Sequence, residues 1–422
     1  MNDIIYYTYS FCPECLRETV AEIISADGEV YLRKKCPEHG EFMTLIWQDD
    51  AEAFLEWMEA GGIDVKDLPR SVDALERKRN YRCRLEPSNG KQPTTAALMV
   101  TAKCNLSCPV CFTKSMDGKE AEPSLEELKR LLDNYKDFAG EGAPLEFCGG
   151  EPTTRPDIFQ LAEYARSVGF DYIQLNTNGI RLAGESDYCR KLKDSGITTV
   201  YLGFDGIDDN VYRYKYSADL FDTKREAIKN CVKAGLAIVL VPCIIPGVND
   251  DQLGAIIRIA KEGMPSVKGV YFQPISYFGC YPSDGRQRIT IPEIMRRIES
   301  QTGGEINASD FLPGNYEHPL CSFQGIFLKD RNNSLKALTR LDKRQLNEHN
   351  FIRIRNNAKY LWSESNQSYL TIGGMAFQDV WNYDSQRTGR CSIQIIGRNG
   401  SLVPLCAKYL TSAAGRRVLH EE

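Results

Sequence analysis

Three cysteines stand close together in the middle of the chain, and their spacing suits an iron–sulfur cluster. Three residues separate Cys104 from Cys108, and two more lead to Cys111. Three thiolates on one tight loop can hold three irons of a [4Fe–4S] cube and leave the fourth iron open to a small chelating ligand. A structural zinc site normally takes four ligands, so the trio fits zinc poorly. Pro109 lies within the motif and favours a loop over buried packing of the thiols.

A second group of metal-ligand residues lies near the N-terminus. Cys12 and Cys15 are followed, after twenty intervening residues, by Cys36 and His39. Three thiolates and one imidazole favour tetrahedral Zn²⁺, whereas a rubredoxin-like iron prefers four thiolates. Cys83 is the alternative to His39 as the fourth ligand. The metal is expected to have a structural role, because a small region with few apolar residues needs a cross-link to be stable.

A repeated strand–helix pattern must position the middle cysteines. Six short apolar segments are typical of parallel strands that are buried on both faces. Between them, Ser124 and Glu127 form a capping-box pattern, and Gly235 and Gly263 follow two further helical segments. Six units with right-handed crossovers predict an α/β fold, an incomplete (β/α)₆ barrel, whose chemistry lies at the carboxyl ends of the strands. The expected strands cover residues 97–103, 145–148, 172–177, 200–205, 237–244 and 270–275.

The composition restricts the class of protein further. The 422 residues carry a formal net charge of −5, which argues against nucleic acid as a partner. The longest apolar stretch, residues 236–248, contains two prolines and is too short to span a bilayer. Fifteen cysteines without a signal segment at the N-terminus indicate metal or redox chemistry in a cytoplasmic protein rather than a secreted disulfide scaffold.

Three regions of the chain differ in texture. We expect a zinc-ribbon or rubredoxin-like metal domain over residues 1–90, the partial barrel over 91–290 and a C-terminal extension over 291–422. The segment 329–357 is rich in Arg, Lys and Asn. It is expected to be a solvated loop or helix face rather than a site for nucleic acid.

The middle cysteine loop, with Phe112 directly after it, resembles the cluster loop of the radical S-adenosylmethionine (radical SAM) superfamily. The resemblance continues in order over residues 95–280, at one expected strand end after another. In that family the segment at 149–151 meets the amino group of SAM, later strand ends contact its ribose and carboxylate, and the sixth lies beside the adenine. The cofactor-binding residues implied here are Gly149, Gly150, Glu151, Thr177, Asn178, Asp205, Gln273 and Phe112.

The resemblance implies a radical enzyme that uses a [4Fe–4S] cluster and SAM. The open iron would chelate SAM, and one electron passed to the sulfonium would release methionine and a 5′-deoxyadenosyl radical. That radical abstracts hydrogen from an unactivated C–H bond, while the protein orients the substrate and excludes water and oxygen. The chemistry also implies an external one-electron donor, such as flavodoxin or ferredoxin, as a partner.

The late cysteines resemble the C-terminal part of one group in this superfamily, whose best-known member is the archaeal tetraether lipid synthase. The stretches that carry the likeness are 377–384, 387–391 and 403–407. The N-terminal knuckles, which are the Cys12–Cys15 and Cys36–His39 pairs, also fit the group. Such proteins hold auxiliary iron–sulfur clusters beside the SAM cluster. The ligands implied for an auxiliary cluster are Cys321, Cys391, Cys406 and, as a plausible fourth, Cys280, with Cys243 behind it.

Three functions remain open at this point. The leading one is hydrogen abstraction followed by C–C bond formation on lipid chains, which calls for a long apolar tunnel beside the cluster loop and for work at a membrane surface. The alternative is radical modification of a peptide or small molecule by methylation, thioether formation or dehydrogenation. A non-catalytic iron–sulfur sensor or binding protein is the third, but a sensor does not need the strand-end residues.

Overall fold

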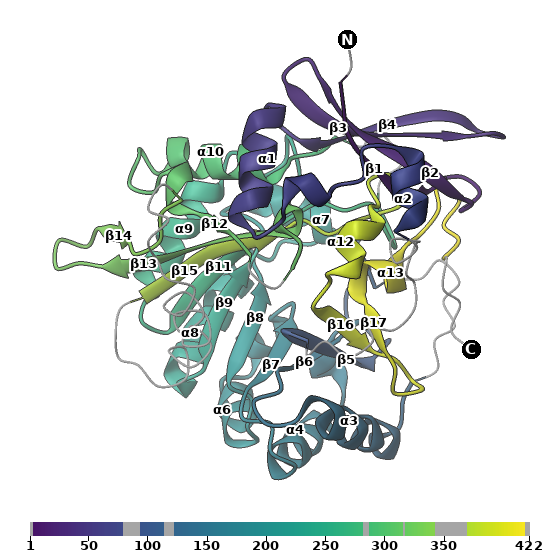
Figure 1. Ribbon diagram of the computed structural model, residues 1–422. Coiled ribbons are helices and arrows are strands. Elements are labelled where there is room, and N and C mark those ends of the chain that lie inside the picture. The colour runs from purple at the N-terminus through teal and green to yellow at the C-terminus, as the bar shows by residue number, and fades with distance from the viewer. Residues whose placement is uncertain are drawn as a thin grey trace.

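The computed structural model describes residues 3–78, 93–113, 122–281, 287–314, 317–341 and 369–417 (Figure 1). A small N-terminal sheet lies beside one end of a larger curved sheet that carries helices along its outside. Cys83 and residues 342–357 of the basic segment lie outside the described residues. None of the helices in the described ranges is long and apolar enough to cross a membrane.

The N-terminal sheet is antiparallel and keeps its strands in chain order. Tyr6, Ile23 and Leu32 are fully buried, and the strand that carries Leu32 alternates buried with more exposed positions, as expected where one face of a sheet is covered. Helix α1 (Ala51–Ala60) covers that face with Phe54, and its first turn is capped by the Asp50 side chain, which accepts from the Ala53 amide at 2.9 Å. The strands are β1 (Asp3–Phe11), β2 (Glu18–Ala26), β3 (Glu29–Cys36) and β4 (Gly40–Trp47), and η1 (Val65–Asp67) and α2 (Val72–Arg77) follow α1.

The larger sheet contains the six predicted parallel strands as direct neighbours, in the order β11-β9-β8-β7-β6-β5. The predicted partial barrel is therefore confirmed. One expected strand, 237–244, is divided into two, because Pro242 interrupts it and has no N–H for the ladder. The strands are β5 (Thr95–Thr101), β6 (Leu145–Gly149), β7 (Ile173–Thr177), β8 (Thr199–Gly203), β9 (Ala237–Val241), β10 (Cys243–Ile244) and β11 (Val267–Pro274).

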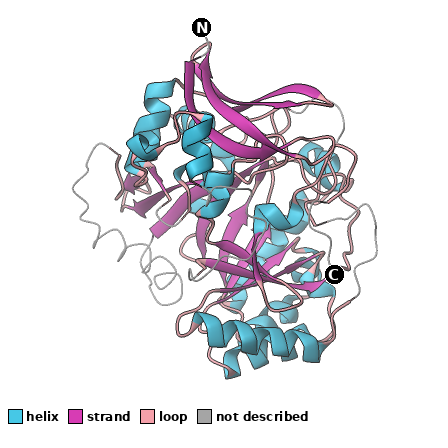
Figure 2. Cartoon of the chain, turned by 45° about the vertical axis from the view of Figure 1, so that its right-hand side comes forward, coloured by secondary structure: helices cyan, strands magenta, loops and turns pink. Residues whose placement is uncertain are grey.

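Helices connect these strands and lie on the outer side of the sheet (Figure 2). The predicted capping box is present: the Glu127 amide donates to Ser124 Oγ at 3.2 Å, and the Ser124 amide donates to the Glu127 carboxylate at 2.7 Å. Gly235 ends its helix at a φ of +71°. The helices are α3 (Leu125–Ala139), η3 (Pro152–Thr154), α4 (Ile158–Ser167), α5 (Ile180–Gly184), α6 (Ser186–Asp194), α7 (Asp209–Tyr216), α8 (Phe221–Ala234), α9 (Leu253–Glu262) and α10 (Ile291–Gln301).

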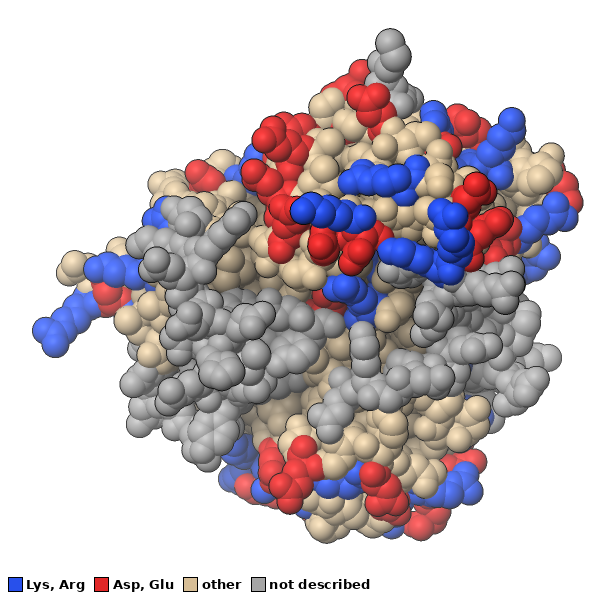
Figure 3. Space-filling model, viewed as in Figure 1, with Lys and Arg blue, Asp and Glu red and all other residues tan. Residues whose placement is uncertain are grey.

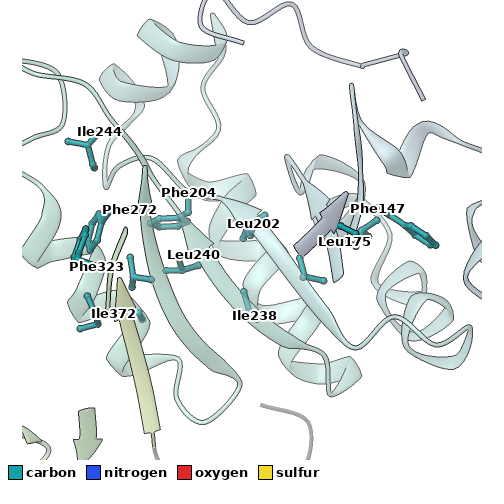
Figure 4. Close-up of a cluster of buried hydrophobic side chains, with 14 of the residues drawn as sticks. Phe147, Leu175, Leu202, Phe204, Ile238, Leu240, Ile244, Phe272, Phe323 and Ile372 are labelled. Atoms are coloured by element: carbon teal, nitrogen blue, oxygen red, sulfur yellow. The ribbon is translucent and has the colours of Figure 1, made fainter. Parts of the chain in front are cut away.

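The two faces of the barrel strands differ in chemistry. The outward side chains are apolar and fully buried against the helices, as Phe147, Leu175 and Leu202 are in Figure 4. The inward positions of the same strands carry polar groups, among them Glu146 and Asn176. The inner face lines a cavity instead of packing against a second layer, and it combines these polar groups with apolar ones such as Val239 and Val270.

The C-terminal region extends both edges of the same sheet. Strand β15 (Tyr369–Met375) pairs in parallel with β11, and β16 (Ile393–Ile396) pairs in parallel with β5. Strands β15 and β16 of this region are thus part of the barrel wall, and the proposed domain boundaries at 90 and 290 remain predictions. The other elements are η4 (Ala308–Asp310), β12 (Leu312–Pro313), η5 (Pro319–Cys321), β13 (Ser322–Lys329), β14 (Leu335–Ala337), α12 (Ser385–Gly389), β17 (Leu402–Pro404) and α13 (Leu405–Tyr409).

Buried polar contacts fasten the N-terminal sheet to the C-terminal region. The Tyr6 hydroxyl donates to one oxygen of Asp384 at 2.9 Å, and the Thr8 hydroxyl donates to the other at 2.5 Å. The Lys34 ammonium is buried and donates to the Val380 carbonyl at 2.5 Å. These contacts join segments more than 340 residues apart and hold the metal knuckles against the barrel.

The outer surface carries both signs of charge. Figure 3 shows acidic and basic side chains interspersed over the N-terminal part and over the helices at the opposite end. Among the described residues on this face, no broad field of Lys and Arg stands out. This agrees with the small net charge of −5 for the whole chain.

Candidate functional site

The middle cysteine loop leaves the carboxyl end of β5 and opens into the main cavity of the described structure, which has a volume of about 690 Å³. The Leu106 amide donates to Cys104 Sγ at 3.4 Å, so the backbone folds around the first thiol. Burial, followed by the neighbouring thiols, raises the pKa of Cys108 to about 12. A cationic iron centre would offset that cost, because metal ligation stabilises the thiolate. The donor set, three thiols at the rim of a cavity, fits a [4Fe–4S] cluster with one open corner.

Two glycines bring the end of β6 against this loop. A Cβ atom on Gly149 would lie 2.3 Å from the Thr101 carbonyl oxygen, and one on Gly150 would lie 2.3 Å from that of Lys103. Gly149 also has a φ of +145°. Only glycine fits at both places, and the approach lets the Gly150 amide donate to Thr101 at 2.9 Å. The spacing of β5 and β6 at the cavity therefore depends on the absence of side chains.

Glu151 ties the ends of β6 and β7 together. Its Oε1 accepts from the Thr153 amide at 3.0 Å and from the Thr177 hydroxyl at 2.8 Å, and its Oε2 accepts from the Asn178 amide at 2.6 Å. The residue is only 1% exposed. The carboxylate thus serves the protein itself, and its contact with SAM remains a prediction. Asn178 in turn donates to Asn105 of the cysteine loop at 2.7 Å, which links the third strand end to the first.

Asp205, at the end of β8, is fully buried and binds two side chains of α7. Lys215 Nζ and the Tyr216 hydroxyl each donate to its carboxylate at 2.5 Å. Burial alone would lower the pKa of Lys215, but the Asp205 carboxylate raises it overall. Lys215 lines the cavity whereas Asp205 stands behind it. Asp205 was expected from the sequence, but Lys215 was not. A lysine on an amphipathic helix usually faces solvent, so nothing in the sequence marks Lys215 as buried.

Lys224 is a second buried cation behind the strand ends. Its ammonium donates to the Asn178 carbonyl at 2.6 Å and lies 4.8 Å from the centre of the Tyr216 ring. Burial lowers the pKa of Lys224 to about 8. The side chain therefore supports the end of β7 through this hydrogen bond, although burial of the charged ammonium is unfavourable.

The last two cofactor residues of the prediction lie at other parts of the rim. The backbone amide of Gln273 donates to the Pro242 carbonyl at 2.8 Å. This bond fixes the position of Gln273 at the end of β11. Phe112 packs edge-on against Phe278 and Tyr409. All predicted residues of the SAM site except Asp205 line the cavity: Cys104, Cys108, Cys111, Phe112, Gly149, Gly150, Glu151, Thr177, Asn178 and Gln273.

The N-terminal metal ligands are already assembled. One ligand atom from each of Cys12, Cys15, Cys36 and His39 lies within 4.8 Å of the others. His39 Nδ1 is 3.7 Å from Cys12 Sγ and 3.5 Å from Cys36 Sγ. Bonds of about 2.0–2.3 Å to a tetrahedral zinc place ligand atoms roughly 3.3–3.8 Å apart. The site therefore fits Zn²⁺ with His39 as the fourth ligand.

Three late cysteines converge on a small second cavity of about 20 Å³. Cys321 accepts from Arg387 Nε at 3.4 Å, and Cys406 accepts from the Gln378 amide at 3.2 Å. Burial raises the pKa of Cys406 to about 12. Cys391 lines the same cavity. The structure thus brings together three ligands predicted for an auxiliary cluster, with a guanidinium beside them.

Cys280, the plausible fourth ligand of that cluster, lies elsewhere. Its amide donates to the Cys111 carbonyl at 2.8 Å and its carbonyl accepts from the Cys111 amide at 2.8 Å. Cys280 and Cys243 both line the main cavity and are not among the residues around the small one. The structure therefore groups Cys280 with the middle cysteine loop.

The fold and these sites define a class of protein. Residues 98–260 match the Radical SAM superfamily, and residues 4–48 match the HMPTM N-terminal zinc ribbon domain. Residues 98–260 are thus a radical SAM domain. Such a domain implies a [4Fe–4S] cluster and SAM, and the zinc ribbon match agrees with a metal at the N-terminal knuckles.

Three relatives narrow the comparison. A 7,8-dihydro-6-hydroxymethylpterin dimethyltransferase of Methanocaldococcus jannaschii is 38% identical over 78% of this chain and 65% of its own length. An Fe-coproporphyrin III synthase of Methanosarcina barkeri is 35% identical over 37% of this chain and 38% of its own. A probable GTP 3′,8-cyclase of Methanothermobacter thermautotrophicus is 27% identical over 42% of this chain and 57% of its own. The chain spans less than two thirds of each of these relatives.

Among solved structures, the native anSMEcpe with bound AdoMet is 17% identical to this chain, with a TM-score of 0.40. The match covers 50% of this chain and 59% of that one. The resemblance to the tetraether lipid synthase group stays unconfirmed, since the relative that matches most of this chain here is named as a pterin dimethyltransferase.

Proposed function

We propose that this protein cleaves SAM reductively and uses the resulting radical to remove hydrogen from a C–H bond of a small heteroaromatic substrate of the pterin class. A second SAM then supplies the methyl group and leaves as S-adenosylhomocysteine, and the external donor provides the two electrons that the whole reaction needs. The observation that carries the proposal is one shared space: the three-thiol loop and the strand ends predicted to hold SAM open into the same 690 Å³ cavity. That volume suits a cofactor and a small ligand together.

The chain's own residues bind and orient, while the cofactors carry the difficult step. When bound, the cluster and SAM supply an electron and a radical able to remove hydrogen from a C–H bond. Cys104, Cys108 and Cys111 would hold the cluster. The Lys215 ammonium, kept charged by Asp205, faces the cavity and provides a positive group for the carboxylate of SAM.

The lining of the cavity is largely apolar but includes a group of polar side chains, which suits a ring with polar edges better than a lipid chain. A tetraether-type substrate calls for a long apolar tunnel, but Glu146, Gln174 and Asn176 line this cavity. Covering a carboxylate with methylene groups is costly. A pterin offers donors and acceptors on a flat ring. The M. jannaschii relative is named for a pterin substrate, which supports the same choice.

Two further parts of the proposal concern electrons. We propose that a small donor such as flavodoxin or ferredoxin reduces the cluster. We also propose that Cys321, Cys391 and Cys406 hold an auxiliary iron–sulfur cluster, with Arg387 beside it to stabilise negative charge on the thiolates.

The test is an anaerobic assay of the reconstituted protein with dithionite, SAM and 7,8-dihydro-6-hydroxymethylpterin, read by mass spectrometry. We expect 5′-deoxyadenosine and a pterin heavier by one or two methyl groups. Cys104→Ala should form neither product. The matched control is Cys189→Ala, because Cys189 is packed against Cys231 between helices and lies away from the cavity.

Two other outcomes of this assay would contradict the proposal. 5′-Deoxyadenosine with a desaturated or thioether-linked product would replace methylation by one of the other radical modifications. A fully loaded cluster that forms no 5′-deoxyadenosine would overturn the enzymatic proposal and favour the sensor.

A further inference from the structure

A strip of polar side chains crosses the inner surface of the barrel below the SAM site. Glu146 of β6 and Gln174 of β7 are register partners, and Asn176 lies two residues further along β7. All three line the cavity. Glu146 precedes Gly149 by three residues, so at about 3.3 Å per residue it lies roughly 10 Å deeper than the glycines. The strip is thus placed for a substrate beneath SAM rather than for SAM itself.

Hydrogen bonds within the strip fix the orientation of the carboxylate. Asn176 Nδ2 donates to Glu146 Oε1, and Gln174 Nε2 donates to Asn176 Oδ1 at 2.9 Å. The Tyr172 hydroxyl donates to Gln174 Oε1 at 3.4 Å. Each amide is oriented by its neighbour, so Glu146 presents its carboxylate in a preset direction.

Aromatic rings border the cavity beside this strip. Tyr201 is the register partner of Asn176, and its ring lies 6.5 Å from that of Tyr271, centre to centre. Both residues line the cavity. Flat apolar walls with one oriented carboxylate suit a planar ring that carries N–H donors on its edge.

We propose that Glu146 determines substrate specificity by accepting two N–H groups from one edge of a 2-amino-4-oxopyrimidine ring. The exocyclic amine and the adjacent ring N–H of such a ring point the same way, as two N–H groups of a guanidinium do, and one carboxylate accepts both. The inference rests on the proposed function. It adds which hydrogen-bond donors of the substrate the protein recognises and which residue accepts them. Pterins and the guanine base of GTP share this edge.

The first test changes the ligand and leaves the protein intact. The probes are 6-hydroxymethylpterin and 6-hydroxymethyllumazine, which has oxygen in place of the 2-amino group. Binding to the anaerobic, cluster-loaded protein with SAM is followed by equilibrium dialysis. We expect the pterin to bind at least about 10-fold more tightly, because the lumazine leaves one side of the carboxylate facing an oxygen. Equal affinity for both probes would overturn the inference.

The second test changes Glu146. Glu146→Gln should weaken pterin binding by roughly 10- to 100-fold, the effect of losing a charge-assisted pair of hydrogen bonds. It should also narrow the preference for pterin over lumazine. Glu163→Gln, an exposed glutamate of α4, is the matched control and should bind as the wild type does. Iron content and the thermal unfolding midpoint show that both variants are folded.

The inference and the proposed function fail in different ways. Wild-type protein that forms 5′-deoxyadenosine but does not distinguish the two probes contradicts the role of Glu146 and leaves SAM cleavage standing. Protein that binds pterin through Glu146 but forms no 5′-deoxyadenosine supports the recognition of the ring and contradicts the radical chemistry. A Glu146→Gln variant with wild-type affinity and selectivity contradicts the inference outright.

Discussion

The two cysteine sites of this protein differ in how their ligands are arranged before a metal is considered. At the N-terminus, one ligand atom from each of four residues already lies within 4.8 Å of the others. At the end of β5, three cysteines follow one another along a loop at the rim of a 690 Å³ cavity. A single tetrahedral ion needs close, complete ligation, whereas a cluster that must bind a cosubstrate needs an open side.

The comparison teaches that the ligand set and its surroundings together separate a structural metal from a catalytic one. The N-terminal knuckles are held against the C-terminal segment: the Ala413 amide donates to the Pro13 carbonyl at 2.8 Å. The middle loop is tied instead to other strand ends through Asn105 and Asn178. One site fastens parts of the chain together, and the other faces a space that a ligand can enter.

The largest expected effect comes from breaking the middle site. Cys108→Ala should lower 5′-deoxyadenosine formation by more than about a hundredfold, since loss of a residue that only supports a metal ligand already costs 10- to 100-fold. The measurement is anaerobic product formation by liquid chromatography. Retention of wild-type activity would show that Cys108 does not hold the cluster.

An effect on iron content is expected at the late cysteines. If Cys321, Cys391 and Cys406 hold a second cluster, the wild type carries about eight irons per chain and Cys391→Ala about four. Iron and sulfide analysis after anaerobic reconstitution measures this, with Cys231→Ala as the control. About four irons in both wild type and variant would remove the auxiliary cluster from the account.

Breaking the N-terminal site should affect stability. We expect Cys36→Ala to release the bound metal and lower the free energy of unfolding by about 3 kcal/mol or more, as loss of a structural staple does. At about 1 °C per kcal/mol for a chain of this length, the midpoint of thermal unfolding falls by roughly 3 °C or more. Calorimetry with and without a chelator measures it, and a midpoint unchanged in both tests would contradict a structural role.

The stability of the protein as a function of pH tests whether Lys224 is buried behind the strand ends. Its ammonium loses the proton near pH 8 in the folded protein and near 10.5 in the unfolded chain. Between these values the unfolded chain binds the extra proton, so through this residue the free energy of unfolding rises with pH, by up to about 3 kcal/mol. Lys224→Met should remove this rise. Urea unfolding of both proteins from pH 7.5 to 10.5 decides it, and parallel curves would show that Lys224 is not buried as a cation.

The smallest effect is expected at the start of α3. Ser124→Ala removes the cap of α3 and should cost about 1 kcal/mol of stability. Neither metal content nor 5′-deoxyadenosine formation should change. A loss of iron in this variant would mean that the cluster site responds to any destabilisation, which would weaken the conclusions drawn from the other variants.

Local features of the site were predictable from the sequence, and distant ones were not. The spacing of Cys104, Cys108 and Cys111 and the six strands of the partial barrel are written in short stretches of chain, and the structure has both. Lys215 and Lys224 were missed because their burial depends on how α7 and α8 pack behind the strand ends. Glu146 lay in an expected strand, but the direction of its side chain follows from the register of the sheet.

The C-terminal region shows the same limit. Nothing local in residues 369–375 or 393–396 indicates that these strands pair with β11 and β5. Their pairing extends the wall around the cavity at both edges of the sheet. Long-range pairing of this kind depends on the whole sheet, so the motif at 387–391 was read only through a resemblance.

The central claim is that three thiols hold a [4Fe–4S] cluster with one iron open to SAM. Electron paramagnetic resonance of the dithionite-reduced Cys391→Ala protein, recorded with and without SAM, tests it most directly. The account predicts that SAM changes the spectrum of the remaining cluster. An identical spectrum in a sample with four irons per chain and SAM in excess would contradict it.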